Sequence, residues 1–416
     1  MASALGSCRV LDLTCGGSLI AGRVLGDLGA DVIQIEPPGG NPGRSIGPFY
    51  NDVPHPERSL FWYAYAANKR GVTLDIATSD GREIFRKLAA SADFIIESFD
   101  PGYMDFLGLG YEALNQINPR LVLTSITPYG QTGPKAGHRA SDLTLWAAGG
   151  QLYSSGQPDR PPNWISYPQA YLQAGVEAAS ASLIAHWHTE MCGEGQWVDV
   201  SVQECVMGLL MNAVQFWDMS RTIVKRIGYR LPSPRLSMGL GYACKDGWIS
   251  SYVLGGSALG FTPHMRELVK WLEEEGMAPE WLKDFDWVNE MDASKLTQEK
   301  YDRIEEPFVR FFKTKTKQEL LDRALKGKHV LIGPVQTPRD IAEDRQLRER
   351  RFWVDVEHPE LDAEVTYCGP FAKLSETPCQ IRRRAPLIGE HNEDIYCHEM
   401  GFSRKDLAVL KQARVI

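Results

Sequence analysis

"RVLDLTCGGSLIAGRVLGDLGADVIQIE", residues 9–36, decides the fold of this chain. Residues 9–14 are an apolar run typical of a buried strand, and residues 18–30 carry apolar side chains at helical spacing. Residues 31–36 form a second apolar run, which ends in Glu36. Strand, helix and strand in this order predict a βαβ unit, in which the two strands lie parallel.

The same alternation continues along the chain. Further strands are expected at residues 71–76, 93–99 and 120–126, and a helix is expected at residues 81–92. Repeated βαβ units place helices on both faces of a mainly parallel sheet. The sequence therefore predicts the α/β class, with a Rossmann-like large domain.

The chain changes character after this domain, and we expect three parts. The large domain covers residues 1–225, and a smaller α+β domain covers residues 226–330, where "YACKDGWISS" predicts two short strands about a turn. Residues 331–416 form an extended return segment and a C-terminal helix that join the large domain. Because its Pro-punctuated stretches 331–355 and 378–395 are too extended to bury themselves, we expect another chain to cover them.

Composition excludes two classes of partner. The chain has 416 residues, of which 43% are hydrophobic, so it can bury a large core. Its 45 basic and 53 acidic residues give a net charge of −8, and no run of Lys and Arg is long enough to follow a nucleic acid. Nothing resembles a signal peptide or a run of about 18 apolar residues, so we expect a cytoplasmic protein without a membrane partner.

Resident cofactors are not expected either. The stretch "TCGGSLIAG" after the first strand lacks the GxGxxG spacing of a dinucleotide site, so Gly16 and Gly17 are interpreted as a tight turn. The eight cysteines show no CxxC spacing and are interpreted as reduced thiols. His391, Cys397 and His398 lie close together in the sequence, but no second ligand pair matches them, so no metal is predicted.

Residues 165–187, "ISYPQAYLQAGVEAASASLIAHW", predict a loop that leads into a buried helix. Small residues recur in this helix at Ala174, Gly175, Ala178 and Ala179, which lets a neighbouring backbone approach closely. Tyr171 stands at the start of the helix. Its role decides what chemistry this chain can perform.

Seven segments in order, over nearly the whole chain, resemble the class III CoA-transferases of the CaiB/BaiF type. They are "VLDLT" (10–14), "LGDLGADVIQIEPPGGNPGR" (25–44), "NKRGVTLDI" (68–76), "ADFIIESFDPGYMDFLGLGYEALNQINPRLV" (92–122), "YGQTGPKAGHRASDL" (129–143), "GEGQWVDVSVQE" (193–204) and "RAPLIGEHNEDI" (384–395). The resemblance implies a Rossmann-like large domain, a small domain and an interlinked dimer. It also implies that coenzyme A thioesters are substrates rather than permanently bound cofactors.

The resemblance breaks at the catalytic residue. In the family an aspartate attacks the donor thioester, and alignment through "LQAG" (172–175) places Tyr171 at this aspartate. Only roughly one phenol in a thousand is ionised at pH 7, a deficit of roughly 4 kcal/mol against a carboxylate, and a phenol cannot form an acyl anhydride. Gln169 is neutral, and Glu177 faces another side of the helix. We therefore expect no catalytic residue here, and interpret Tyr171 as a space-filling ring with a hydrogen-bonded hydroxyl rather than a catalytic phenol.

The CoA-binding positions are partly retained. Arg44, Lys69 and Arg70 match positions that hold the nucleotide phosphates in the family, and Phe99 matches an aromatic residue near the adenine or pantetheine. In contrast, Asp100 and Phe106 replace residues that usually favour phosphate, and Ser98 replaces an asparagine. The alternative for the three cations is a solvated or interdomain surface.

The acyl-CoA racemases of the same superfamily offer another interpretation. They use a histidine and an aspartate for proton transfer, but alignment through Asp142 places Ser141 at the histidine and Tyr171 at the aspartate. His138 lies three residues away from the required position. Neither a serine nor a phenol is suited to proton transfer near neutral pH, so racemase activity is not expected.

The resemblance thus implies a non-catalytic subunit of a heteromeric class III CoA-transferase, whose partner is a homologous, aspartate-bearing subunit. Within the family it is similar to the subunit lacking this aspartate in enzymes that move CoA from succinyl-CoA to (R)-benzylsuccinate in anaerobic toluene degradation. Two alternatives remain open. One is a self-sufficient acyl-CoA transferase or isomerase with an altered nucleophile, and the other is a CoA-sensing or structural pseudoenzyme.

Overall fold

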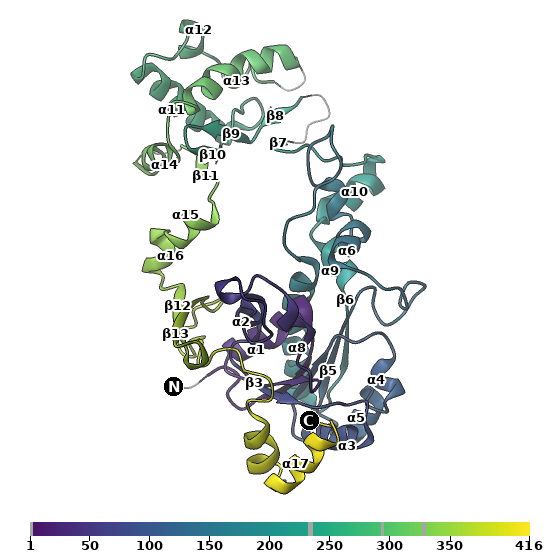
Figure 1. Cartoon of the computed structure of the whole chain (residues 1–416). Coiled ribbons are helices and arrows are strands. Elements are labelled where there is room, and N and C mark those ends of the chain that lie inside the picture. The colour runs from purple at the N-terminus through teal and green to yellow at the C-terminus, as the bar shows by residue number, and fades with distance from the viewer. Residues whose placement is uncertain (1–2, 232–235, 293–294, 327–329) are drawn as a thin grey trace. The chain divides into compact units, whose positions relative to one another are not determined.

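The computed structural model describes residues 3–231, 236–292, 295–326 and 330–416 (Figure 1). The chain forms two compact units, each built from segments that are separate in sequence. Unit 1 comprises residues 1–152, 164–214 and 345–416, and unit 2 comprises residues 153–163 and 215–344. Each unit is described by itself below.

Unit 1 is built on a six-stranded parallel sheet, which confirms the predicted α/β fold. The strands are β1 (Arg9–Leu13), β2 (Asp31–Glu36), β3 (Lys69–Thr73), β4 (Phe94–Glu97), β5 (Val122–Thr127) and β6 (Trp197–Ser201). Their order is β3-β2-β1-β4-β5-β6. The inner strands are buried along almost their whole length, as the apolar runs of the sequence indicate.

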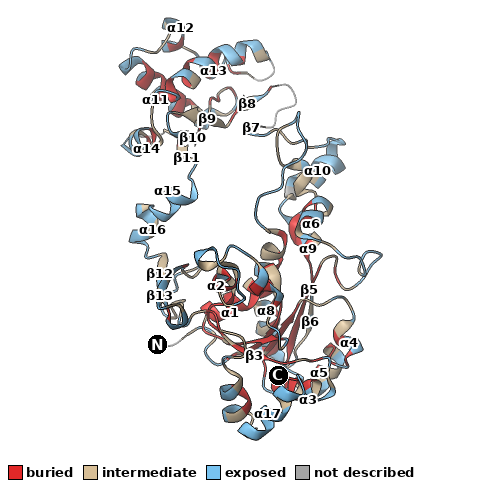
Figure 2. Cartoon of the chain, in the orientation of Figure 1, coloured by how far each residue is buried: buried red, intermediate tan, exposed pale blue. Residues whose placement is uncertain are grey.

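Two apolar clusters cover the two faces of this sheet, because successive strand residues point to opposite sides. Val10 and Val32 belong to the cluster that holds α1 (Ile20–Asp27) against α8 (Ala170–Cys192), and η1 (Gly16–Leu19) also contacts α8. Leu11 and Ile33 belong to the other cluster, with α3 (Ser79–Ala89) and α5 (Tyr111–Ile117). The helices therefore cover both faces, and burial is concentrated around the sheet (Figure 2).

Shorter elements complete unit 1. Those before residue 215 are η2 (Pro42–Ser45), η3 (Tyr50–Asp52), α2 (Leu60–Ala66), α4 (Tyr103–Phe106), α6 (Asp142–Ala148) and α9 (Val202–Gly208), while α7 (Gln151–Ser154) and α10 (Met211–Ser220) each cross a boundary between the units. Those after residue 344 are α16 (Arg345–Glu349), β12 (Trp353–His358), η5 (Pro359–Leu361), β13 (Ala363–Cys368), η6 (Glu393–Glu399) and α17 (Arg404–Gln412). The β12–β13 hairpin packs on α2, where the rings of Tyr63 and Tyr367 stack.

The return segment corrects one expectation. Residues 378–395 were predicted to need cover from another chain, but they pack along the outer edge of β3 in the same chain. Trp62 Nε1 donates to Pro386 O (3.0 Å), Asn68 Nδ2 to Gln380 O (2.7 Å) and His391 N to Gly71 O (2.9 Å). β3 is an edge strand, and this segment satisfies polar groups that such a strand leaves unpaired.

Unit 2 combines short strands with amphipathic helices. Its elements are β7 (Arg230–Leu231), β8 (Met238–Gly239), β9 (Gly241–Cys244), β10 (Gly247–Ser250), η4 (Leu259–Phe261), α11 (Thr262–Glu274), α12 (Glu280–Lys283), α13 (Gln298–Phe312), α14 (Lys317–Lys326), β11 (Gly333–Pro334) and α15 (Pro338–Ala342). β9 and β10 form the antiparallel pair that the sequence predicts. Trp271, Phe308 and Phe311 lie in the apolar core of this unit.

Candidate active site

The candidate site lies where the strand order of the sheet reverses, between β1 and β4. In open parallel sheets, ligands bind at the carboxyl ends of the strands on either side of such a point. Cys15 follows β1 and Ser98 follows β4, and Cys15 N donates to Ser98 Oγ (3.0 Å), which ties the two loops together. α8 begins beside them, in contact with η1.

Tyr171 lies in the first turn of α8, close against the turn after β1. A Cβ atom added to Gly17 would lie 2.7 Å from Cβ of Tyr171, and one added to Gly175 would lie 2.5 Å from Cγ2 of Ile20. Both glycines are therefore required for the close approach of η1 and α8. The small residues noted in the sequence thus serve to fix the backbone of Tyr171.

The electrostatic environment keeps the phenol of Tyr171 neutral. Burial, with smaller contributions from the nearby Cys15 and Asp142, raises the pKa of Tyr171 to about 12. The ring packs on the apolar cluster of unit 1, as expected for a space-filling side chain. The hydroxyl, however, has no hydrogen-bond partner among the described residues, so the expected hydrogen bond is not formed within that part of the chain.

Asp142 was not predicted from the sequence as a site residue. It is the first residue of α6, and its side chain contacts the start of α8. Its Oδ2 accepts a hydrogen bond from Ala170 N (2.8 Å), and its Oδ1 accepts one from Trp164 Nε1 (3.2 Å). Asp142 follows Ser141, which caps α6 with its side chain. The Ser-Asp pair signals the start of α6, but the contact with Ala170 depends on the tertiary fold and could not be inferred.

Two of the predicted phosphate-binding cations are buried and paired. Arg44 is 1% exposed; its Nε donates to Glu36 (2.6 Å) and its Nη1 to Glu57 (2.7 Å). Lys69 is fully buried and donates to Asp12 (2.7 Å), while burial lowers its pKa. Neither residue is solvated, contrary to the alternative considered from the sequence. Their binding to phosphate stays a prediction.

Arg70 and Phe99, the other two residues predicted to bind CoA, do not lie together with Arg44 and Lys69 in the structure. Arg70 donates to both oxygens of Asp31 (2.9 and 2.6 Å) and pairs with Glu399. Since Arg70 lies near the start of β3, it is at the opposite end of the parallel sheet from Ser98. Phe99 follows β4 beside the candidate site, and its ring centroid lies 5.0 Å from that of Tyr103.

Unpaired basic side chains near Tyr171 lie instead in the loop between β5 and α6. Lys135 and His138 both pack on Tyr129, with Lys135 Nζ at 5.7 Å from the ring centroid and the two aromatic ring centroids 6.3 Å apart. Tyr129 is among the residues that affect the pKa of Tyr171. Lys135 and Arg139 form no ion pair within the described ranges.

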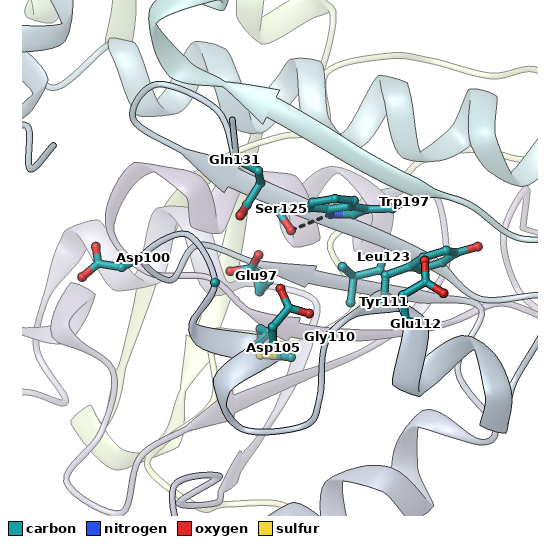
Figure 3. A pocket seen from close by; sticks show the side chains of 12 residues that line it. Glu97, Asp100, Asp105, Gly110, Tyr111, Glu112, Leu123, Ser125, Gln131 and Trp197 are labelled. Atoms are coloured by element: carbon teal, nitrogen blue, oxygen red, sulfur yellow. Dashed lines mark hydrogen bonds between the residues drawn. The ribbon is translucent and has the colours of Figure 1, made fainter. Parts of the chain in front are cut away.

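A small cavity of about 80 Å³ is lined by Glu97 at the end of β4, by Ser125 within β5 and by Trp197 at the start of β6 (Figure 3). Glu97 is buried in its wall, and burial raises the pKa of Glu97 to about 7. Trp197 Nε1 donates to Ser125 Oγ (3.0 Å) across the cavity, and the acidic lining also includes Asp100. The cavity is too small for an acyl-CoA, and its carboxylates disfavour an anionic ligand.

Neither metal nor membrane features emerge from the described segments. They contain no group of three or more His, Cys, Asp or Glu side chains arranged to hold a metal ion. His391, which the sequence raised as a ligand, has its Nδ1 occupied by Gly71 N (3.2 Å). In these same segments, no helix has the length and apolar character needed to cross a bilayer.

The sheet order and the position of the site define a Rossmann-like α/β protein. The model of CoA-transferase family III matches residues 5–392, and the chain belongs to this family, which confirms the resemblance. The chain is 37% identical over 390 residues, 93% of this chain and 92% of the relative, to "Succinyl-CoA:(R)-benzylsuccinate CoA-transferase subunit BbsE" of Thauera aromatica.

Two further comparisons support this assignment. The chain is 31% identical over 100% of both chains to a formyl-CoA:oxalate CoA-transferase of Streptomyces coelicolor. Among solved structures, it is similar to a CAIB/BAIF family protein from Brucella suis, with a TM-score of 0.79 and 28% identity over 96% of this chain and 100% of the other. Coenzyme A thioesters are the substrates of this family.

Proposed function

We propose that this chain is the non-catalytic subunit of a heteromeric class III CoA-transferase in the cytoplasm. The observation that carries the proposal is Tyr171, a phenol with a pKa raised to about 12 at the position of the family's aspartate. A homologous subunit that retains the aspartate would perform the chemistry. The similarity to a protein named as a subunit supports this assignment.

The proposed reaction moves CoA from succinyl-CoA to an organic acid, with (R)-benzylsuccinate as the proposed acceptor. A carboxylate nucleophile attacks the thioester carbonyl, CoA leaves as a thiolate, and the enzyme holds an acyl anhydride. The thiolate then attacks the enzyme carbonyl of the anhydride, which releases the donor acid and leaves CoA as a thioester of the enzyme. The acceptor carboxylate attacks this thioester and expels the thiolate, which then attacks the acceptor carbonyl of the second anhydride to give the acceptor thioester and the free enzyme carboxylate. Tyr171 cannot begin this sequence, because a neutral phenol is a poor nucleophile and would form an ester rather than an anhydride.

We further propose that this chain's own nucleotide groove binds CoA weakly. Arg44 and Lys69 are neutralised by carboxylates inside the protein, so moving either to a phosphate would leave a buried carboxylate without its partner. Lys135 is the better candidate for contact with a phosphate, since it lies near Tyr129 without an ion pair in the described chain. Asp100 opposes binding of an anion nearby.

A second candidate function follows from Asp142. This carboxylate is held at the start of α8 by Ala170 N and Trp164 Nε1, and it lies close enough to influence the pKa of Tyr171. In a self-sufficient transferase, Asp142 would replace the missing nucleophile. We favour the subunit, because both oxygens of Asp142 are already used to fix the local structure.

The test compares this chain alone, the homologous aspartate-bearing chain alone, and the two co-expressed. The proposal predicts transferase activity for the co-expressed pair, no activity for this chain alone, and no hydroxylamine-sensitive acyl group on it after incubation with succinyl-CoA. Intact mass and peptide mapping follow the acyl group. An adduct on Asp142 would instead establish the self-sufficient enzyme, and one on Tyr171 would contradict both.

A further inference from the structure

Unit 1 contains a second, larger cavity, of about 500 Å³. It is lined by residues of α16 and β12 (Figure 1), by the turn between them, and by residues 369–373 and 379–381. Its volume lies in the range of small-molecule sites, about 300–1,000 Å³. It shares no lining residue with the cavity beside Glu97, and neither Tyr171 nor Asp142 lines it.

The backbone holds the walls of this larger cavity in place. Gly369 N donates to Phe352 O (2.7 Å), and a Cβ atom added to Gly369 would lie 2.3 Å from Phe352 O, so this close approach requires glycine. Lys373 Nζ donates to Arg350 O, which ties residues 369–373 to the end of α16. Arg351 turns the chain into β12 with φ of 52°, a left-handed conformation that is uncommon in residues other than glycine.

The charge of the lining favours an anion. Arg350, Arg351 and Lys373 all line the cavity and are exposed, and none of the described lining residues is acidic. The two arginines form no ion pair in the parts of the chain that the structure describes. A guanidinium binds a carboxylate through two parallel hydrogen bonds, so a carboxylate ligand would satisfy donors that the chain leaves free.

The other walls of the cavity are apolar. Phe352, Val354 and Ile381 line it, and so does Phe371, which is 62% exposed although an aromatic ring gains much from being covered. A bare inorganic anion would satisfy the cations but leave these side chains in water. The ligand that matches both features carries its charge on an apolar body.

We propose that this cavity binds an organic acid in which a carboxylate is attached to an aryl or alkyl group. The carboxylate contacts Arg350 and Arg351, and the apolar group covers Phe352 and Phe371. The site does not depend on the proposed function, because Tyr171 and a partner subunit have no part in it.

Calorimetry tests the ligand class with phenylbutyrate, its neutral amide phenylbutyramide, and acetate. The full chain should bind one phenylbutyrate, and the co-expressed pair should bind it as well. The amide lacks the charge and acetate lacks the apolar group, so each should bind about tenfold more weakly or not at all.

Substitutions test the two features of the site separately. Arg350→Gln should weaken phenylbutyrate binding about tenfold, whereas Arg348→Gln should leave it within twofold, since Arg348 is exposed on α16 but lies outside the lining. Phe371→Ser should also weaken binding, and Leu374→Ser is its control, because Leu374 is 38% exposed and does not line the cavity. The thermal midpoint of Arg350→Gln should match that of the unsubstituted chain, because no ion pair is removed.

Cys379 reports on the place of binding. Its partly buried thiol lines the cavity, while Cys192 is exposed on α8 outside the lining. Phenylbutyrate should slow alkylation of Cys379 by iodoacetamide and leave alkylation of Cys192 unchanged, as peptide mapping measures. Equal slowing of both cysteines would contradict binding in this cavity.

Four other outcomes would overturn the proposal. Equal affinity for the amide would mean that the carboxylate is not recognised, and equal affinity for acetate would mean that the apolar walls are not used. Protection of Cys379 by coenzyme A but not by phenylbutyrate would assign the cations to phosphates. Loss of phenylbutyrate binding in the co-expressed pair would mean that the partner covers the cavity. None of these outcomes bears on the non-catalytic role proposed from Tyr171.

Discussion

Tyr171 is the residue on which the proposed non-catalytic role depends. Its backbone is fixed by contact with Gly17, and its phenol is neutral because burial raises the pKa to about 12. We predict that Tyr171→Phe leaves the activity of the assembled pair within twofold, since only an unpaired hydroxyl is removed. Steady-state transferase assays measure this, and a tenfold fall in kcat would show that the hydroxyl participates.

The contact between Gly17 and Tyr171 gives a second prediction. Gly17→Ala should destabilise the chain by about 1–3 kcal/mol, because the added methyl group would lie 2.7 Å from Cβ of Tyr171 and force the two backbones apart. Gly208→Ala is the control, since nothing lies within 4 Å of its added methyl group. Urea unfolding measures both variants. If the Gly17→Ala and Gly208→Ala variants were equally stable, η1 and α8 would be able to move apart without a loss of stability.

Glu97 should make the stability of unit 1 depend on pH. Its pKa is raised to about 7 in the folded chain from 4.5, so the folded state holds a proton that the unfolded state has released. The associated stability is complete below pH 4.5 and is lost as pH rises through about 7, an effect of about 3 kcal/mol. Glu97→Gln should therefore stabilise the chain at pH 8 but not at pH 4.5, as measured by urea unfolding. The same gain in stability at pH 8 and at pH 4.5 would contradict this prediction.

Substitution of Lys69 can distinguish a structural role of this residue from a role in phosphate binding. Removing one partner of a buried ion pair typically costs about 3–5 kcal/mol, so Lys69→Met should destabilise the chain strongly even without CoA, because Asp12 is left unpaired. Lys135→Met is the comparison, and we expect it to leave stability unchanged and to weaken any CoA binding. Urea unfolding and calorimetry with CoA measure the two effects. If Lys69→Met instead weakened CoA binding with little loss of stability, and Lys135→Met left binding unchanged, Lys69 would be a phosphate ligand.

At the scale of elements, the sequence predicted most of the sheet but not the surroundings of its charged residues. The strands at 9–14 and 31–36 are apolar runs, and local pattern alone identifies such strands. The burial of Arg44 could not be predicted, because its partner Glu57 and its contact Pro386 O come from separate segments. Phe99 lies two residues after β4, so its place at the carboxyl end of this strand follows from the strand pattern, while its contact with CoA stays a prediction.

The sequence pattern also led to a wrong expectation for the return segment. Residues 378–395 contain Pro and Arg and lack a regular period, so the sequence indicated an extended connection that another chain covers. In the structure, Arg382 donates to Gly26 O and Gly29 O, and Asn68 Oδ1 accepts from Arg382 N. Backbone groups of other segments provide these partners, and no local periodicity encodes them. Irregular segments are therefore the least predictable part of this fold from sequence.

At the scale of the whole molecule, the connection around α16 should report on assembly. Arg345, Arg350 and Arg351 are exposed there, so trypsin should first cut the isolated chain within residues 345–351. Arg382–Arg384 provides an internal control, because it is equally basic but hydrogen-bonded to unit 1. In an interlinked pair the cut should be slowed. Peptide mapping over time measures both sites, and equal cutting rates with and without the partner would argue against interlinking.

The discontinuous composition of unit 1 also constrains its synthesis. The edge strand β3 ends at Thr73, but the segment that covers it begins near residue 380, about 300 residues later. Ile395, Tyr396 and Val415, which fill the cluster on one face of the sheet, emerge later still. At about 5–20 residues per second, the nascent chain carries this uncovered apolar sheet for roughly 15–60 s on the ribosome. The edge of β3 and this face of the sheet therefore stay uncovered until the C-terminal segment emerges, and the waiting intermediate is a natural client for chaperones.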